Sequence, residues 1–419
     1  MIDSRRAIEA VWRIESVRLI AGLARIVQDV ALAEDVAQDA LVAALQQWPE
    51  SGVPDNPGAW LMAVGRRRAI DILRRRATLA HKHEEIGREL EVRDALARAE
   101  HEMTSDDVGD DRLRLVLAAC HPVLSTDARV ALTLRMLGGL TTDEIARAFL
   151  VPEATIAQRI VRAKRTLTES RVPFEVPRAD ELAARLASVL EVVYLIFNEG
   201  YSATEGDEWM RPGLCDEALR LGRILAELVP RVSEVHGLVA LMELQASRLR
   251  ARVGPTGEPI LLLDQNRARW DRLLIGRGLA ALRRAERLGD SLGPYRLQAS
   301  IAACHAQAAD AGHTDWERIA ALYDALAQLA PSPIVELNRA VAVGMAFGPA
   351  AGLEIIERLE AEPSLRTYHL LPGVRGDLLE KVGRRAEAAA QFRRAAELTR
   401  NGRERTLLLD RAARAAADA

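Results

Sequence analysis

Apolar side chains recur at α-helical spacing along most of the chain, and this pattern limits the fold more than any other feature. In residues 153–168, for example, Ile156, Ile160, Ala163 and Leu167 fall at positions i, i+4, i+7 and i+11 and form one stripe. Aromatic residues make up only 4% of the sequence, which disfavours a β-sandwich or a barrel. The sequence therefore predicts an all-α protein.

Length and charge limit the organisation further. The chain has 419 residues, about three times a typical domain of roughly 150, so we expect two or three domains. The hydrophobic fraction of 49% is enough for a packed core, and 57 Lys and Arg against 60 Asp and Glu give a net charge of −3. A near-neutral total leaves nucleic-acid binding open, because local clustering of charge decides it.

Two groups of predicted helices are separated by an acidic segment. The first group is expected at 5–28, 33–47 and 57–76, with a loop at 48–56 that contains Pro49 and other breakers. Residues 82–111 then carry eleven acidic and four basic side chains, which predicts a linker. The second group of helices is expected at the following ranges: 112–120, 126–137, 141–149 and 153–168.

The helix predicted at 57–76 has a cationic face. Trp60, Arg67 and Arg74 recur every seven residues, away from the apolar face, and Arg66 lies beside them. Guanidinium groups bind phosphates, and a neighbouring Trp offers a stacking surface for an exposed base. The alternative is a solvated Arg-rich helix end with Trp60 half-buried.

Residues 140–167 have the pattern of a helix-turn-helix. Thr141 and Glu144 fit a capping box that begins one helix, and Pro152 stands at the start of the next. The side of the second helix opposite its apolar stripe carries Thr155, Gln158, Arg159, Arg162 and Arg165. Arg and Gln can read base edges in a major groove. The alternative is an ordinary helical hairpin with a basic outer face.

A polar face in residues 33–45 groups Asp35, Gln38 and Asp39. Such a face is able to dock a basic partner helix, although a solvated helix surface is the simpler interpretation of this motif alone.

The C-terminal part shows a repeat pattern. The helix pair around Gly376 and Phe392 has the small and large residues typical of a tetratricopeptide unit, with weaker matches 33 and 36 residues apart. The segment 260–272 contains Asp264, Arg267 and Trp270, together with Gln265, Arg269 and Asp271. We interpret these residues as an intramolecular regulatory contact or a ligand pocket; the alternative is loop-to-helix capping with a buried Trp270.

Catalysis, metal binding and membrane insertion have no support in the sequence. Cys120, Cys215 and Cys304 are far apart and predict buried small side chains, and no histidine has metal-ligand spacing. Phosphate-loop and dinucleotide motifs are absent, as are an apolar signal core and a membrane-length apolar run. We expect a cytoplasmic protein that is not an enzyme and has no cofactor.

The order of the acidic helix, the WLMAVGRRRAIDILRRR helix, the acidic linker and the helix-turn-helix resembles the extracytoplasmic-function sigma factors of the sigma-70 family. The resemblance covers about residues 1–170. It implies that Asp35, Gln38 and Asp39 grip the β and β′ subunits of core RNA polymerase. It also implies that the loop 48–56 and the helix Trp60–Arg76 melt and read the −10 element. Thr155, Gln158, Arg159 and Arg162 would meet the −35 element of promoter DNA.

The whole architecture resembles the subgroup with a long tetratricopeptide-like extension. The resemblance implies sigma domain 2 at 1–80, the linker at 81–111, sigma domain 4 at 112–172, a helical extension at 178–275 and repeats at 276–419. We expect the extension to pack on the sigma domains and regulate them. Arg67 replaces a common Asn, and Ala157 and Gln158 replace the usual Arg-Ser, so no promoter sequence is predicted.

Two other classes of protein remain open on the sequence. One is a one-component helix-turn-helix regulator that senses a ligand or peptide through the helical extension. The other is a repeat scaffold that binds peptides, in which the basic helices are incidental.

Overall fold

The computed structural model describes residues 2–82, 107–149, 151–177, 179–204, 206–289 and 292–417. Over these ranges the regular elements are α-helices and four short 3₁₀ helices, and the β pairing found there is two isolated bridges. The all-α prediction is confirmed. Most of the acidic segment predicted at 81–111 lies outside the described residues.

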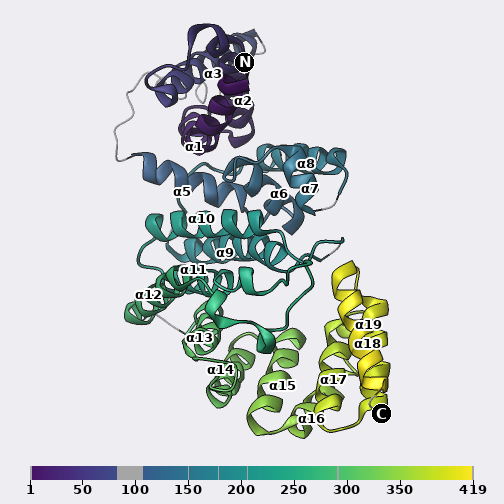
Figure 1. Cartoon of the computed structure of the whole chain (residues 1–419). Coiled ribbons are helices and arrows are strands. Elements are labelled where there is room, and N and C mark those ends of the chain that lie inside the picture. The colour runs from purple at the N-terminus through teal and green to yellow at the C-terminus, as the bar shows by residue number, and fades with distance from the viewer. Residues whose placement is uncertain are drawn as a thin grey trace. The chain divides into compact units, whose positions relative to one another are not determined.

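The chain forms two compact units, Met1–Leu195 and Ile196–Ala419, and each is described by itself. The first unit begins with α1 (Ile2–Val27), α2 (Val30–Ser51) and α3 (Pro57–Lys82), which all pack on one another (Figure 1). Leu23, Ala37 and Leu61, one from each helix, are at most 1% exposed in their shared core.

Four further helices complete most of the first unit. They are α5 (Asp107–Ala119), α6 (Thr126–Met136), α7 (Thr142–Phe149) and α8 (Glu153–Glu169). α5 packs on α1, and α8 contacts α6, α7 and α2. The last helix to begin in this unit, α9 (Ala179–Tyr201), is joined to α6 by Arg129, which donates to Ser188 Oγ at 2.5 Å and to Glu191 at 3.0 Å.

The predicted end of the second helix is wrong. The loop expected from Trp48 begins only after Ser51, because α2 continues through Pro49. Trp48 is 2% exposed, and its carbonyl accepts a hydrogen bond from Gly52 N at 3.0 Å. Burial of this indole extends the helix for one turn past the point where proline would otherwise stop it.

The second unit is a succession of helices that pack on their neighbours in sequence (Figure 1). Its α-helices after α9 are α10 (Pro212–Leu228), α11 (Ser233–Ala246), α12 (Arg272–Leu288), α13 (Pro294–Gln307), α14 (Trp316–Leu329), α15 (Pro333–Phe347), α16 (Pro349–Leu359), α17 (Leu370–Lys381), α18 (Arg385–Leu398) and α19 (Gly402–Ala417). The 3₁₀ helices η1 (Leu249–Ala251), η2 (Leu262–Asp264) and η3 (Arg267–Arg269) lie in the connection between α11 and α12.

Helices α17 and α18 lie close together at Gly376, as this small residue predicts. A Cβ at Gly376 would lie 2.7 Å from the ring of Phe392, which is completely buried. Gly376 therefore lets the two helices approach at this point.

Cys120, Cys215 and Cys304 are free and buried, as predicted. Burial raises the pKa of the Cys120 thiol to about 11 and that of Cys215 to about 12. Both thiols are therefore protonated at neutral pH and act as small apolar side chains.

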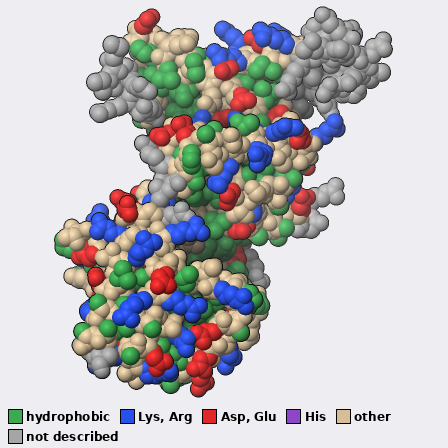
Figure 2. All heavy atoms as spheres, turned by 90° about the vertical axis from the view of Figure 1, so that its right-hand side faces the viewer, with side chains coloured by type: hydrophobic (Ala, Val, Ile, Leu, Met, Phe, Trp, Pro, Cys, Tyr) green, Lys and Arg blue, Asp and Glu red, His purple; other side chains and the backbone are tan. Residues whose placement is uncertain are grey.

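Among the described residues we find no cluster of side chains that could hold a metal ion and no helix with the length and hydropathy of a membrane span. Figure 2 shows basic and acidic side chains interspersed over the visible face.

Candidate nucleic-acid and polymerase interface

The helix-turn-helix pattern is present in the structure and is built as predicted. Glu144 N donates to Thr141 Oγ1 at 3.1 Å, and Thr141 N donates to the Glu144 carboxylate at 2.8 Å, which completes the capping box at the start of α7. Pro152 occupies the N-cap position of α8 and makes no side-chain capping hydrogen bond. The predicted apolar stripe of α8 is fully buried: Ile156, Ile160, Ala163 and Leu167.

The opposite side of α8 presents the predicted reading residues. Gln158, Arg162 and Arg165 are exposed, whereas Thr155 and Arg159 are half-buried. Two of the arginines are held by acids of the same unit, Arg159 by Asp127 at 3.1 Å and Arg165 by Glu169 at 2.6 Å. These exposed pairs are weak and can be exchanged for phosphate or base contacts.

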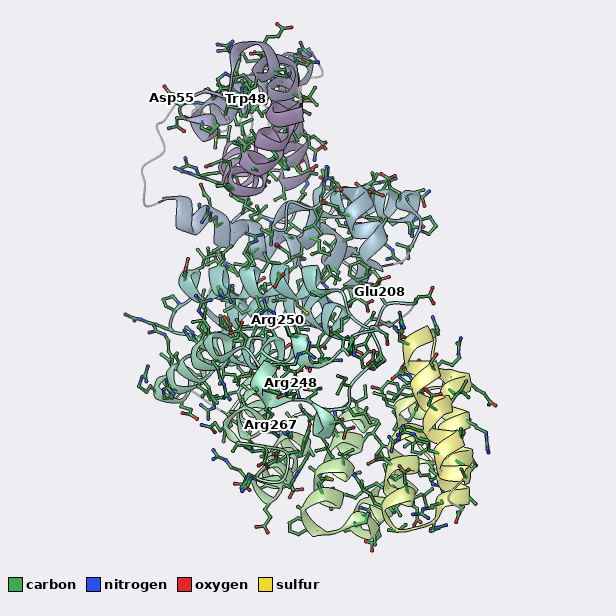
Figure 3. All side chains as sticks on the ribbon, in the orientation of Figure 1. Trp48, Asp55, Glu208, Arg248, Arg250 and Arg267 are labelled. Carbon is green, nitrogen blue, oxygen red and sulfur yellow. The ribbon has the colours of Figure 1, made fainter. Side chains whose placement is uncertain are left out.

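The cationic face of α3 has one aromatic and three basic members. The Trp60 and Trp48 rings meet edge to face, with centroids 5.2 Å apart, and Trp60 stays half-buried. Arg67 and Arg74 are exposed and Arg66 is half-buried. Asp55, in the loop that joins α2 to α3, lies in the same region as Trp48 (Figure 3). The loop and the start of α3 thus join an aromatic pair to a basic helix face.

The three residues predicted to bind polymerase already have partners within the first unit. Asp35 pairs with Lys164 of α8 at 2.8 Å, and Asp39 pairs with Arg68 of α3 at 3.0 Å. Gln38 donates to Glu34 at 2.6 Å, one turn earlier on α2. Asp35 and Asp39 are nonetheless 66% and 57% exposed, so a competing cation can reach both carboxylates.

Glu34 is the residue of this face that the sequence reasoning missed. Its side chain is 3% exposed and forms ion pairs with Lys164 of α8 and with Arg135 of α6, the latter at 3.2 Å. Burial alone would lower the pKa of Lys164, but Glu34 and Asp35 together raise it above its ordinary value. The charged cluster of Glu34, Asp35, Arg135 and Lys164, which we call the α2–α8 clasp, joins the first helical group to the second.

A sequence signal for the clasp exists but is faint. Lys164 follows the buried Ala163 directly and lies four residues after Ile160, at the edge of the apolar stripe. A basic side chain at such an edge predicts a nearby acid, but nothing in the sequence says which acid it is.

In the segment 260–272 some side chains are buried or cap a helix, and others are exposed to solvent. Asp271 caps α12 by accepting from the backbone N–H of Leu273 and Leu274, and Trp270 is 3% exposed. This is the capping alternative given above for the segment. Arg267 is buried, whereas Asp264 is exposed.

Comparisons with known proteins agree with this geometry. Residues 14–78 match the family described as Sigma-70 region 2, and residues 114–167 match Sigma-70, region 4. Residues 185–286 match a family of unknown function, DUF6596.

Two relatives cover different lengths of the chain. The uncharacterized protein R00370 of Rhizobium meliloti (strain 1021) is 44% identical over 391 residues, which are 92% of this chain and 90% of the relative. A probable ECF RNA polymerase sigma factor, SigI of Mycobacterium tuberculosis, is 29% identical over 173 residues, or 41% of this chain and 58% of that protein.

The two sigma-70 segments place the chain among non-enzymatic proteins, so the prediction that it is not an enzyme is confirmed. They also imply binding to core RNA polymerase and to promoter DNA.

Proposed function

Because the chain belongs to the family of R00370 of Rhizobium meliloti and carries sigma-70 regions 2 and 4, we propose that it is an extracytoplasmic-function sigma factor. It directs core RNA polymerase to promoters and carries a tetratricopeptide-like extension that regulates it. The observation that supports this most is the pairing of two cationic helices, α3 and α8, with the two sigma-70 segments in the expected order.

Region 4 reads the −35 element through α8. Thr155, Gln158, Arg159 and Arg162 face the major groove, where Arg and Gln make bidentate contacts to guanine and adenine. Arg165, one turn beyond Arg162, binds phosphate and fixes the orientation of the helix.

Region 2 engages the −10 element through α3 and the loop before it. Arg66, Arg67 and Arg74 bind the phosphates of the opened strand. Trp60, supported edge-on by Trp48, supplies a stacking face for an unpaired base.

Core polymerase engages α2 through Asp35, Gln38 and Asp39. Since these residues hold Lys164, Glu34 and Arg68 within the unit, polymerase has to exchange the internal partners for its own cationic groups. We infer that binding to polymerase opens the α2–α8 clasp and frees α8 to reach the −35 element.

The test is transcription by the full chain added to core polymerase, with promoters selected from a random pool. We expect transcripts from an enriched promoter class, and a loss of about 1–3 kcal/mol in promoter binding for Arg162→Ala. Arg283→Ala is the matched control, because Arg283 is an exposed arginine on α12 and promoter binding should not change.

Each other outcome has a definite meaning. Tight duplex binding without polymerase, and no co-purification with it, would identify a one-component regulator instead. If Arg162→Ala and Arg67→Ala both leave all activity intact, the chain is a peptide-binding scaffold. A chain that ends at about residue 175, before α9, and has the same promoter activity as the full protein would remove the regulatory role of the extension.

A further inference from the structure

A buried arginine in the second unit has no acidic partner among the residues that the structure describes. Arg252, just after η1, is 7% exposed. Its guanidinium lies over the Tyr201 ring at 3.5 Å from the centroid and 5.4 Å from the centroid of Trp209. Within the described part of the chain this guanidinium makes no hydrogen bond and no ion pair, and it faces two aromatic rings with Arg248 and Cys215 nearby.

Two more arginines extend the same cluster. Arg248 lies between the Tyr201 and Trp270 rings, 5.8 and 5.7 Å from their centroids, and donates to Tyr201 Oη at 2.5 Å. Arg267 lies over the other side of the cluster, 4.9 Å from the Trp270 centroid. Figure 3 shows Arg248, Arg250 and Arg267 around the connection between α11 and α12.

Arg267 is a structural member of the cluster. It donates to the carbonyls of His305 and Ala308 at the end of α13, at 2.5 and 2.8 Å, and to Thr314 at 3.0 Å. It thereby caps that helix and stays fixed, with its charge still in the cluster. Arg248 and Arg252 retain most of their donors for another partner.

The balance of charge in the cluster is positive. Burial, helped by Arg248 and Arg267, lowers the pKa of His305 to about 3, so this ring is neutral at pH 7. Among the described groups, the acid that acts on Arg267 is Asp310, whose side chain is 62% exposed. Buried donors also lack acceptors there, namely Trp209 Nε1, Trp270 Nε1 and Arg267 Nε.

The surrounding backbone holds the cluster in place. Asn401, which is 1% exposed at the start of α19, donates to the carbonyls of Ala203 and Glu208 at 3.1 and 2.8 Å. The loop that carries Trp209 is therefore tied to the last helix of the unit (Figure 3). A rigid setting reduces the ordering cost that a bound ligand would have to meet.

Buried cations in proteins are normally paired with acids. Among the described residues Arg248 and Arg252 form no ion pair, so their guanidiniums are able to accept an anion. Arginine forks match the oxygens of phosphate, and a site with three positive charges favours a multiply charged group over a single carboxylate. We propose that the second unit binds a small phosphate-bearing ligand at Arg248 and Arg252.

Calorimetric titration of the full chain with inorganic pyrophosphate, in phosphate-free buffer at constant ionic strength, tests the proposal. We expect saturable binding at one site that weakens at least tenfold in Arg252→Gln and in Arg248→Gln. Arg250→Gln should bind as the wild type, because Arg250 is exposed on the adjacent 3₁₀ helix. Arg248 is half-buried, so its variant serves if Arg252→Gln does not fold.

Other results would overturn the site. Binding that Arg162→Gln abolishes, while Arg252→Gln and Arg248→Gln keep it, would place pyrophosphate on the DNA-reading helix instead. Equal affinity for citrate and pyrophosphate would contradict the phosphate class, and absence of saturable binding would contradict the site itself. None of these readouts uses polymerase or DNA, so the result does not depend on the proposed function.

Discussion

The α2–α8 clasp and the arginine cluster of the second unit differ in what surrounds their buried charge. In the clasp one acid, Glu34, is nearly sealed from solvent and is met by two bases. In the arginine cluster one base, Arg252, is nearly sealed and is met by aromatic rings. The first arrangement is electrostatically complete within the chain, whereas the second is complete only with a partner from outside.

Buried charge therefore has two roles here, to stabilise an arrangement of helices and to bind a ligand. A complete cluster stabilises one arrangement of its elements, and here that arrangement uses Asp35, one of the residues that we propose for polymerase binding. An incomplete cluster costs stability in the free protein, and such a cost is retained where a ligand offsets it. The two clusters should therefore respond to substitution with opposite signs.

The largest effect is expected for Glu34→Ala. Removal of this acid leaves Lys164 and Arg135 with little solvent and one fewer partner, which costs about 3–5 kcal/mol in the free energy of unfolding of the first unit. Urea unfolding measures the loss, and hydrogen exchange should show faster exchange along α8. Asp71→Ala, at an exposed acid of α3, should change stability by less than about 0.5 kcal/mol. Equal losses of stability for the two substitutions would show that the α2–α8 clasp does not stabilise the first unit.

The second largest effect is a loss of folding stability in acid, caused by protonation of His305 when the chain unfolds. The pKa of this ring is about 3 in the folded chain and about 6.5 when unfolded, so the unfolded chain binds more protons below pH 6.5. Stability is complete above pH 6.5 and falls as pH drops toward 3, by about 2 kcal/mol between pH 7 and pH 5.

Urea unfolding of the wild type and of His305→Gln at both pH values isolates this ring, because the variant lacks the titration. Pyrophosphate should reduce the difference, since a bound anion offsets the charges of Arg248 and Arg267 that disfavour the protonated ring. An identical pH dependence in both proteins would mean that folding does not lower the pKa of His305.

Most of the first unit was predictable from the sequence, because its elements are decided by local patterns. The apolar stripe of α8, the opposite polar face of the same helix and the Thr141–Glu144 capping box all follow from residues within a few turns of one another. The end of α2 was not predictable in this way, since burial of Trp48 outweighs the local effect of Pro49.

The two charged clusters could not be predicted from the sequence either, because local patterns do not identify their members. Glu34 and Lys164 are 130 positions apart, and helical periodicity cannot reveal which acid meets which base over that distance. Arg252 comes just after a 3₁₀ helix, where no repeating pattern marks the buried side. The sequence singled out Arg267 and Trp270 for contact or ligand binding, but it missed the neighbouring Arg252 that makes the cluster incomplete.

A smaller effect of opposite sign to that of Glu34→Ala is expected for Arg252→Met. Methionine has a similar length and fills the space between Tyr201 and Trp209 without a charge. In phosphate-free buffer it should stabilise the second unit by about 1 kcal/mol, because the burial cost exceeds the cation–π contacts that are lost. Arg250→Met should have little effect in the same unfolding assay. A destabilisation by Arg252→Met would show that the cluster is already complete without a ligand.

The smallest effect is expected at the exposed ion pair of Asp127 with Arg159, which we propose for the −35 contact. Asp127 is 67% exposed in its pair with Arg159, and an exposed ion pair contributes about 0–1 kcal/mol. Asp127→Asn should therefore raise the affinity of the polymerase complex for promoter DNA by no more than about fivefold, by releasing Arg159 for the groove. Titration of labelled promoter DNA at several salt concentrations measures the change. In an Arg159→Ala background the same substitution should have no effect, and a gain that persists there would mean that Asp127 acts on DNA by general repulsion rather than through Arg159.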